Sequence, residues 1–407
     1  MSRSSSRSLR LLVLGQASSL FGSAILQLAL AMYVLEATGS AAVFAGMLAA
    51  AGVPSLLLAP LGGAVADRAD KRRMMVTLDL LNGLFSAVAA VLLPRWQGLA
   101  VAGGLLVALS VLGAFETPVV QSCLPAILSG DSLVRGNAAV SQTAAVAALA
   151  APALGGALYA ALSIGPVLWA SAACFLLTAL LECFLQIPAP ARRTGEALLP
   201  ALWEDSKKGI RYLRREGADL LGMLLLAAAG NFFVTGAVVV GLPYLTRSVL
   251  ALGPGWYGGA MAAAAIAGSA WAGLTAGGPR PGRLSRLFAA IGAALLPAGV
   301  LFLFPAGPGL RYAGLVLSCC GMQWAVSAFS VLAVSLIQQR TPMAMMGRVM
   351  ACVSAATLCA QPLGQLLYGL LFDGFRELSA LVLLPTAGAV WALGTASGGF
   401  LRRMEED

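Results

Sequence analysis

The chain repeatedly presents runs of about 20 mainly apolar residues, and this pattern limits the folds it can adopt. A helix needs about 20 such residues to cross a hydrocarbon core of about 30 Å. Only 11% of the residues are charged, whereas a soluble domain is about a quarter charged. The runs predict an all-α membrane protein with twelve transmembrane helices, at residues 9–35, 41–61, 74–94, 98–124, 138–163, 165–187, 220–246, 256–276, 285–305, 311–337, 349–372 and 378–400.

The basic residues predict the orientation of these helices. Of the 26 Lys and Arg residues, all but Arg95, Arg247, Arg311 and Arg376 fall in the loops and ends on the N-terminal side. Cytoplasmic loops are enriched in Lys and Arg. We therefore expect a multi-pass protein of a bacterial-type cytoplasmic (inner) membrane, with both termini cytoplasmic. The net charge of +9 is then spread over loops that flank the membrane and contact its lipids. Because the charge is not gathered in one patch, nucleic-acid binding is not expected.

The longest predicted loop divides the chain into three parts. We expect an N-terminal six-helix half at 1–187, a cytoplasmic linker at 188–219 and a C-terminal six-helix half at 220–407. The linker has apolar residues on one helical face opposite basic residues, which predicts an amphipathic helix in the membrane interface; a partly ordered linker is the alternative. The stretches LGGALY at 154–159 and LGQLLY at 363–368 lie in corresponding spans and indicate duplicated halves.

A cluster of charged residues, in GGAVADRADKRR at 62–73, separates the second and third apolar runs. This loop resembles the signature loop of the major facilitator superfamily. Other stretches resemble the macrolide-efflux, or transmembrane-secretion-effector, branch of that superfamily: GQASSLFGSAILQLALAMYVLEATGS at 15–40, GNAAVSQTAAVAALAAPALGG at 136–156, SKKGIRYL at 206–213 and QQRTPMAMMGRV at 338–349.

The resemblance implies the major facilitator fold and a secondary active transporter. Its expected substrates are amphipathic or hydrophobic small molecules of the drug or macrolide type. Their export would proceed by alternating access, coupled to protons. A siderophore or a lysolipid as cargo is the alternative on the same fold, and a transporter-like receptor that binds a ligand without moving it is a more remote one.

The resemblance also implies a conformational latch at the charged loop. A carboxylate is stabilised by a helix N-terminus that faces it, and in the superfamily this loop meets the start of span eleven. We expect Asp67 to bind that helix start and Arg348 when the cytoplasmic side is closed. Gly63 belongs to the same motif, and Arg68 and Arg72 would hold the loop at lipid headgroups. As an alternative, the charged residues act only as topological anchors.

The fifth predicted span carries part of the antiporter motif of the superfamily. Its residues here are Pro152, Gly155 and Gly156, with Ala151 where a glycine usually precedes the proline. In the signature loop, Asp70 stands where the superfamily usually has glycine. The arginine that many drug antiporters carry in span four is absent.

Polar residues recur at helical spacing in several spans and are candidates for lining a substrate cavity. In span one they include Ser19. A Gln or Asn side chain that faces lipid tails loses hydrogen bonds at a cost in free energy, so these residues are expected to face the protein interior. Hydrogen bonding between helices is the alternative explanation. The candidates are Gln16, Ser23, Gln27, Asn231, Gln323, Ser327, Gln361 and Gln365.

Few acidic residues fall inside the spans. Asp79 and Glu182 lie near span ends and are expected to reach the interface, whereas Glu116 is the deepest acid, in FETPVVQ of span four. Ionisable groups inside a membrane are costly and usually functional. We expect Glu116 to couple proton movement to export; a structural role as a protonated, hydrogen-bonded group is the alternative.

Absent residue types exclude other functions. The chain has no histidine, so catalytic triads and metal sites that use histidine are excluded. It also lacks the Gly-rich loop with Lys that cradles ATP phosphates. The seven cysteines lie in spans without a CxxC pair, and they suggest packing residues. We expect no enzyme, no cofactor and no metal, and a monomer whose partners are a small-molecule substrate, protons and membrane lipids.

Overall fold

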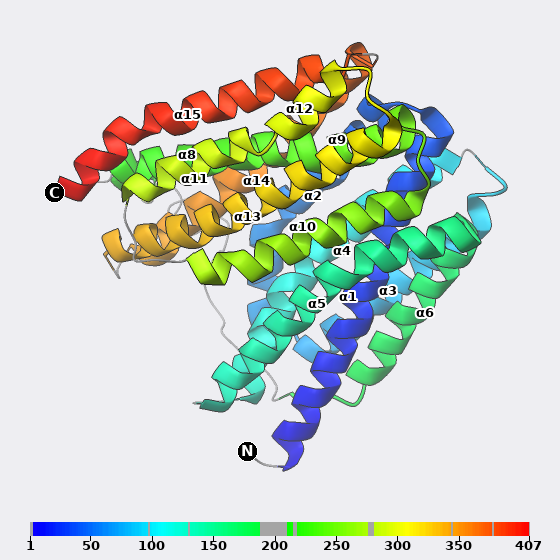
Figure 1. Cartoon of the computed structure of the whole chain (residues 1–407). Helices are drawn as coiled ribbons and strands as arrows, with labels where there is room; N and C mark the ends of the chain where they lie inside the picture. Colours follow the sequence, from blue (N-terminus) through cyan, green and yellow to red (C-terminus); the bar gives the residue numbers. More distant parts are fainter. Residues whose placement is uncertain are drawn as a thin grey trace. The chain divides into compact units, whose positions relative to one another are not determined.

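The computed structural model shows a helical chain that divides into two compact units (Figure 1). The N-terminal unit comprises Met1–Ala37 and Ala50–Leu198, and the C-terminal unit comprises Thr38–Ala49 and Leu199–Asp407. The division therefore falls inside α2 (Ala41–Arg68), whose first turns group with the C-terminal unit. The structure describes residues 3–96, 98–128, 131–187, 210–214, 218–275, 281–342, 345–376 and 378–406.

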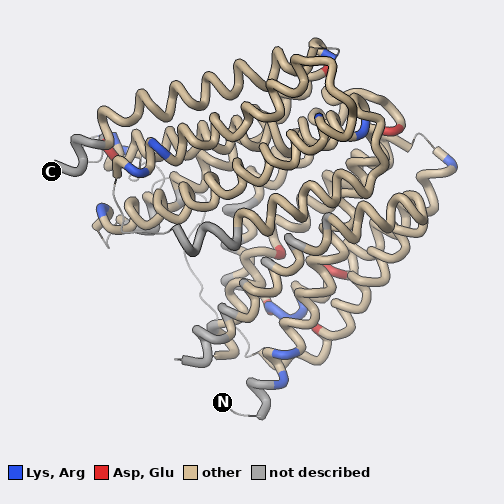
Figure 2. Tube along the Cα trace, viewed as in Figure 1, with Lys and Arg blue, Asp and Glu red and all other residues tan. Residues whose placement is uncertain are grey.

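Six helices account for most of the sequence up to residue 182. Within the N-terminal unit α3 packs against α4 and α6, and α5 packs against both of these helices. Long stretches of helix carry no charged residue, and the basic residues lie near helix ends (Figure 2). Besides α2, the helices are α1 (Arg3–Thr38), α3 (Lys71–Leu92), α4 (Gly98–Ile127), α5 (Asp131–Leu162) and α6 (Ile164–Glu182).

The C-terminal unit contains helices of less regular form. Three of them begin at a proline, whose fixed φ suits the first helical turn and whose missing N–H is not needed there. Its packing pairs are α8 with α14, α10 with α13 and α11 with α15. The elements are α8 (Ala218–Val234), the π-helical η1 (Thr235–Val240), α9 (Gly241–Tyr244), the π-helical η2 (Leu245–Val249), α10 (Pro254–Thr275), α11 (Pro281–Ala293), α12 (Leu296–Leu303), α13 (Pro308–Arg340), α14 (Met346–Gly374) and α15 (Ala380–Glu406).

The helices agree with the predicted all-α membrane fold. Ten helical stretches of the described chain are long and apolar enough to cross a membrane. One of them runs from α8 through η2, and another joins α11 to α12. The long helices α5 and α10 correspond to the two remaining predicted spans, so the twelve-helix fold is confirmed.

The two repeated hexapeptides occupy similar environments in their own units. Gly155 of LGGALY lies against α1: a Cβ atom on it would be 3.3 Å from Cα of Ile25. Gly364 of LGQLLY lies against α8, where a Cβ atom would be 2.1 Å from the carbonyl oxygen of Phe232. In each unit, then, a glycine lets the fifth span approach the backbone of the first, as expected for small residues between membrane helices.

Helices α1 and α6 are joined by hydrogen bonds from small side chains to backbone carbonyls. Ser18 Oγ donates to the carbonyl of Cys174 at 2.9 Å, and Ser171 Oγ donates to that of Gly22 at 3.2 Å. Thr178 Oγ1 donates to the carbonyl of Gly15 at 3.1 Å. Close approach of this kind fixes the register of α1 on α6, and it places one face of α1 beside the acidic residues of the unit.

Most of the predicted amphipathic linker helix lies outside the described residues. Residues 210–214 are helical. Leu213 is buried and Ile210 is exposed. The interfacial helix stays a prediction.

Candidate functional site

Three acidic residues come together inside the N-terminal unit. Asp79 lies on α3, Glu116 on α4 and Glu182 at the end of α6. The side chains of Asp79 and Glu182 are each 1% exposed, and Glu116 is partly exposed. The expectation that the side chains of Asp79 and Glu182 reach the interface is therefore wrong, because both are buried inside the bundle. Figure 2 shows acidic segments part-way along the helices of this unit.

The hydroxyl of Ser19, on α1, connects two of these carboxyls. Its Oγ lies 3.2 Å from Oε1 of Glu116 and 3.3 Å from Oδ1 of Asp79. Asn82, one turn beyond Asp79 on α3, donates from Nδ2 to Oε2 of Glu116 at 3.4 Å. The cluster thus draws polar groups from α1, α3, α4 and α6.

The sequence of α3 explains why this face is polar and buried. Asp79, Asn82 and Ser86 follow helical spacing and share one face, and all three are buried. Ser86 Oγ donates to the backbone carbonyl of Asn82 at 2.8 Å, so it adds no donor for the carboxyls. The large apolar residues Leu80 and Leu84 lie on the exposed side. The helix therefore buries its polar stripe inside the bundle and turns its apolar side outward, as a lipid-exposed helix does.

Several polar atoms of the cluster have no hydrogen-bond partner among the described residues. They are Oδ2 of Asp79, both carboxyl oxygens of Glu182, Oδ1 of Asn82 and Nε2 of Gln16. Asp79 and Glu182 lie close enough for their carboxyls to interact, and two ionised carboxylates have no proton to share. A buried acceptor without a donor is costly. A proton between these two carboxyls would give a hydrogen bond to Oδ2 of Asp79 and to one oxygen of Glu182.

The position of Ser19 leads to the same conclusion. A serine hydroxyl has one hydrogen to donate and lone pairs with which to accept. It can donate to only one of Glu116 and Asp79. The second carboxyl forms a hydrogen bond with Ser19 only if it carries a proton and donates. Both contacts of Ser19, with Glu116 and with Asp79, are therefore hydrogen bonds when one of the two carboxyls is protonated.

No basic side chain is among the hydrogen-bond partners that the described residues give to the three carboxyls. The nearby Lys71 donates from Nζ to the carbonyl of Ala66 at 3.1 Å. No group of three or more metal-ligating side chains able to hold an ion is found among the described residues. Ionisable groups buried inside a membrane bundle are usually functional, which makes these three carboxyls the candidate functional site.

The substrate-cavity candidates have diverse environments. Gln16 and Gln365 are buried, and Gln27 is exposed. Asn231 Nδ2 donates to the carbonyl of Ala227 on its own helix at 3.3 Å.

On α13, two further candidates pack against α10 at a glycine. A Cβ atom on Gly268 would lie 2.7 Å from Cγ of Gln323 and 3.0 Å from Oγ of Ser327. These two side chains therefore contribute to helix packing. Ser23 and Gln361 are partly buried. A role of any candidate in binding a substrate stays a prediction.

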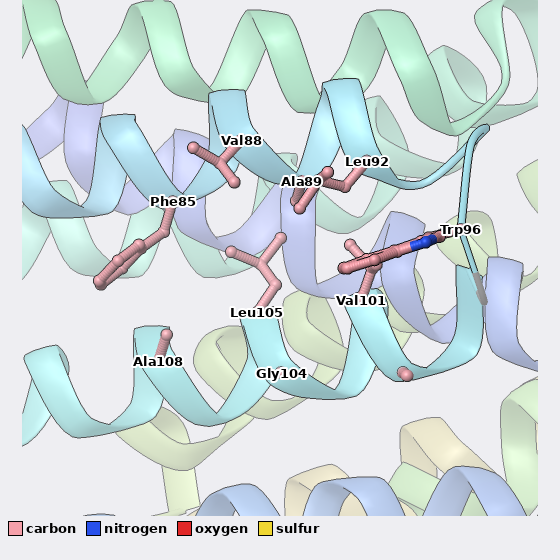
Figure 3. A pocket seen from close by; sticks show the side chains of 10 residues that line it. Phe85, Val88, Ala89, Leu92, Trp96, Val101, Gly104, Leu105 and Ala108 are labelled. Carbon is pink, nitrogen blue, oxygen red and sulfur yellow. The ribbon is translucent and has the colours of Figure 1, made fainter.

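A groove between α3 and α4 was not anticipated from the sequence (Figure 3). Its volume is about 420 Å³, and it is lined by apolar residues such as Phe85, Leu92 and Leu105, with Trp96 at one end. The groove has room for a hydrocarbon chain. It offers no charged side chain to orient a ligand, so it is a weaker candidate for the functional site than the acidic cluster.

Comparison with known proteins identifies the family. The family model of the Major Facilitator Superfamily matches residues 12–367. The chain belongs to the Major Facilitator Superfamily. It is therefore a multi-pass membrane transporter with a small-molecule substrate, and it is not an enzyme. The family that the signature loop and the other quoted stretches indicated is confirmed.

Relatives within the superfamily include efflux proteins. Macrolide efflux protein A of Streptococcus pyogenes is 24% identical over 374 residues, which cover 88% of each chain. Multidrug efflux pump Tap of Mycobacterium tuberculosis (strain ATCC 25618 / H37Rv) is 26% identical over 350 residues, which cover 84% of this chain and 81% of the pump. The similarity extends over both halves of the chain in each case.

Solved structures of the superfamily share the fold. The peptide transporter POT in complex with sulfate has a TM-score of 0.76 at 14% identity, covering 98% of this chain and 94% of the other. A bacterial homolog of the human lysosomal transporter Spinster has a TM-score of 0.68 at 15% identity, covering 98% and 95%. At identities this low, the structural likeness shows the shared fold and does not indicate the substrate.

The signature loop of the superfamily is only partly described. The side chains of Asp67, Arg68 and Arg348 and the surroundings of Gly63 lie outside the described residues, and Arg72 is exposed. The cytoplasmic latch therefore stays a prediction. In the span-five motif, Gly155 and Gly156 are buried, and the surroundings of Pro152 are outside the described part.

Two other residues of this loop have structural roles that the sequence did not reveal. Asp70 is the N-cap of α3: its Oδ1 accepts a hydrogen bond from the backbone N–H of Arg73 at 3.1 Å. Lys71 binds the Ala66 carbonyl near the end of α2. Asp70 has a φ of −65°, so the position that usually holds glycine does not need one here. Capping chemistry explains this departure from the superfamily pattern.

Proposed function

We propose that this transporter exports amphipathic or hydrophobic small molecules of the drug or macrolide type by alternating access, in exchange for protons. The names of the efflux relatives support the direction of transport and the class of substrate. In a bacterial-type inner membrane with both termini cytoplasmic, protons would enter from the outer side while the substrate leaves. The two six-helix halves would rock about a central site.

The observation that carries proton coupling is the hydroxyl of Ser19 between the carboxyls of Glu116 and Asp79. Both contacts of Ser19 are hydrogen bonds when one of the two carboxyls holds a proton. Glu116 is partly exposed, whereas Asp79 and Glu182 are buried. A proton that reaches Glu116 can pass through Ser19 to Asp79 and then to the neighbouring carboxyl of Glu182. Chains of acidic residues of this kind serve as proton relays in membrane transporters.

The proposal assigns a different role to each polar group. Glu116 exchanges a proton with the accessible side of the cluster, and Ser19 passes it on. Asn82 orients the carboxyl of Glu116 through the hydrogen bond to Oε2. Loss of the proton leaves adjacent carboxylates, and no basic side chain among the described residues forms a hydrogen bond with them. That charged state is costly, so its energy can favour the conformation in which protons return.

Accumulation assays in bacteria without their own efflux pumps test the function. Cells that express the transporter should accumulate less ethidium and less erythromycin than cells that do not, and a protonophore should abolish the difference. Cells that express Glu116→Gln should accumulate as much of each probe as cells without the transporter. The control Asp219→Asn removes a carboxyl in the first turn of α8, and cells that express it should accumulate as little as those with wild type. Unchanged accumulation of both probes in cells with folded wild-type protein would contradict the export proposal. Export that a protonophore leaves intact would contradict proton coupling.

A further inference from the structure

A carboxylate from α14 caps the start of α2. Asp373 accepts a hydrogen bond from the backbone N–H of Ala41 at 2.7 Å and from that of Ala42 at 3.1 Å. It also accepts a hydrogen bond from the hydroxyl of Ser40. Ser40 Oγ in turn accepts from the N–H of Val43 at 3.1 Å. The first N–H groups of a helix have no partner within the helix, and here Asp373 and Ser40 together satisfy three of them.

The two helices meet at backbone distance beside this cap. Gly369 lies one turn before Asp373, and a Cβ atom on it would be 2.5 Å from Cβ of Ala45 and 2.9 Å from the carbonyl oxygen of Ala41. Ala41 and Ala45 are fully buried. The atoms nearest to Gly369 belong to alanines of α2, and alanine side chains offer little apolar area, so the hydrogen bonds of the Asp373 carboxylate add specificity to the contact.

Helix α2 can bend just beyond this contact. The division between the units falls between Ala49 and Ala50. Pro54 has no backbone N–H, so the carbonyl of Ala50, four residues earlier, loses its helical hydrogen bond. One gap in the α2 hydrogen-bond ladder, the one that Pro54 causes at the carbonyl of Ala50, therefore lies at the boundary between the units.

We propose that Asp373 is a positioning residue for transport, a latch that holds the first turns of α2 against the end of α14 in one state of the cycle and releases them in the other. The proposal rests on the alternating access proposed above but not on proton coupling. Release would free the first N–H groups of α2 for water and let the helix pivot near Pro54.

The arrangement matches the predicted latch at the other end of the same two helices. Asp67 lies near the C-terminal end of α2 and is expected to bind the start of α14. Asp373 lies near the C-terminal end of α14 and binds the start of α2. In both cases a carboxylate faces a helix N-terminus, where negative charge is stabilised. The two latches would alternate, one for each side of the membrane.

Hydrogen–deuterium exchange in nanodiscs tests the proposal without a substrate. Asp373→Asn should speed exchange of the amides at 38–46 by about tenfold. It should also slow exchange at 65–75 and 345–353, because release of one latch favours closure of the other. Asp373→Glu should restore both regions, and the control Asp219→Asn should change neither. Faster exchange at 38–46 without slower exchange at the other two regions would reduce Asp373 to a local cap and overturn the latch.

A cross-link tests whether the contact must open. In the double variant Ser40→Cys and Asp373→Cys, oxidation should form a disulfide and stop ethidium movement across proteoliposomes measured without a pH gradient. Reduction of the same protein should restore that movement. Failure of the disulfide to form, or equal ethidium movement in the oxidised and reduced protein, would overturn the proposal. If the cross-link blocks ethidium movement and the protein moves no protons, the latch proposal is supported and only proton coupling is rejected.

Discussion

Ser19 Oγ lies 3.2 Å from Oε1 of Glu116, a residue 97 positions away on another helix. The same hydroxyl is 3.3 Å from Asp79. Because this single hydroxyl can donate to only one of the two carboxyls, both contacts are hydrogen bonds only if the other carboxyl carries a proton. The relationship joins Glu116 to Asp79 in one hydrogen-bond network, and the proposed proton coupling rests on this network.

Removal of the Ser19 hydroxyl should uncouple the two carboxyls. We expect Ser19→Ala to lower proton-gradient-driven transport in proteoliposomes by about tenfold or more, because hydrogen bonds to charged groups contribute about 1.5–3 kcal/mol. Ser19→Thr keeps a hydroxyl and should retain most of the activity. The neighbouring Ser18 donates only to a backbone carbonyl on α6, so Ser18→Ala is the matched control and should remain coupled. Equal loss in Ser18→Ala and Ser19→Ala would show that α1 packing, and not proton transfer, was disturbed.

The contact of Gly364 with α8 should not tolerate a side chain. A Cβ atom there would be 2.1 Å from a backbone oxygen, so α8 and α14 would have to move apart. We expect Gly364→Ala to lower the free energy of unfolding by about 1–3 kcal/mol. Gly388 on α15 has nothing within 4 Å of such an atom, and Gly388→Ala should be neutral or slightly stabilising. Thermal unfolding in one detergent compares the two variants, and equal midpoints would contradict the close approach.

The capping of α3 by Asp70 should contribute to the stability of the signature loop. Asp70→Ala removes the acceptor for the N–H of Arg73, and loss of an N-cap costs about 1 kcal/mol. Asp70→Asn keeps an acceptor and should cost less. Local amide exchange at 71–75 measures the effect. If Asp70→Ala leaves that exchange unchanged while transport falls, Asp70 acts in the transport cycle and not as a cap.

Hydropathy predicted the twelve helices because a membrane-spanning backbone must satisfy its hydrogen bonds within each helix. The same one-dimensional signal misplaced Asp79 and Glu182. Both lie near the ends of their own apolar runs, but burial depends on the neighbours of a helix. The spacing of Gln16 and Ser19 indicated a polar face on span one, yet spacing along one helix cannot show which acids that face meets. The caps formed by Asp70 and Asp373 were missed for the same reason, since a cap is visible only with its helix N-terminus in place.

Simultaneous measurement of substrate and proton movement tests the central claim most directly. Proteoliposomes with an acidic lumen that contains pyranine would receive external ethidium. For wild type we expect ethidium to enter while the lumenal pH rises faster than in protein-free liposomes, because molecules whose outer face lines the lumen exchange protons for dye. Glu116→Gln should show neither change, and Asp219→Asn should match wild type. Ethidium entry by wild type with no additional proton movement, or full exchange by Glu116→Gln, would contradict proton coupling through the Glu116–Ser19–Asp79 cluster.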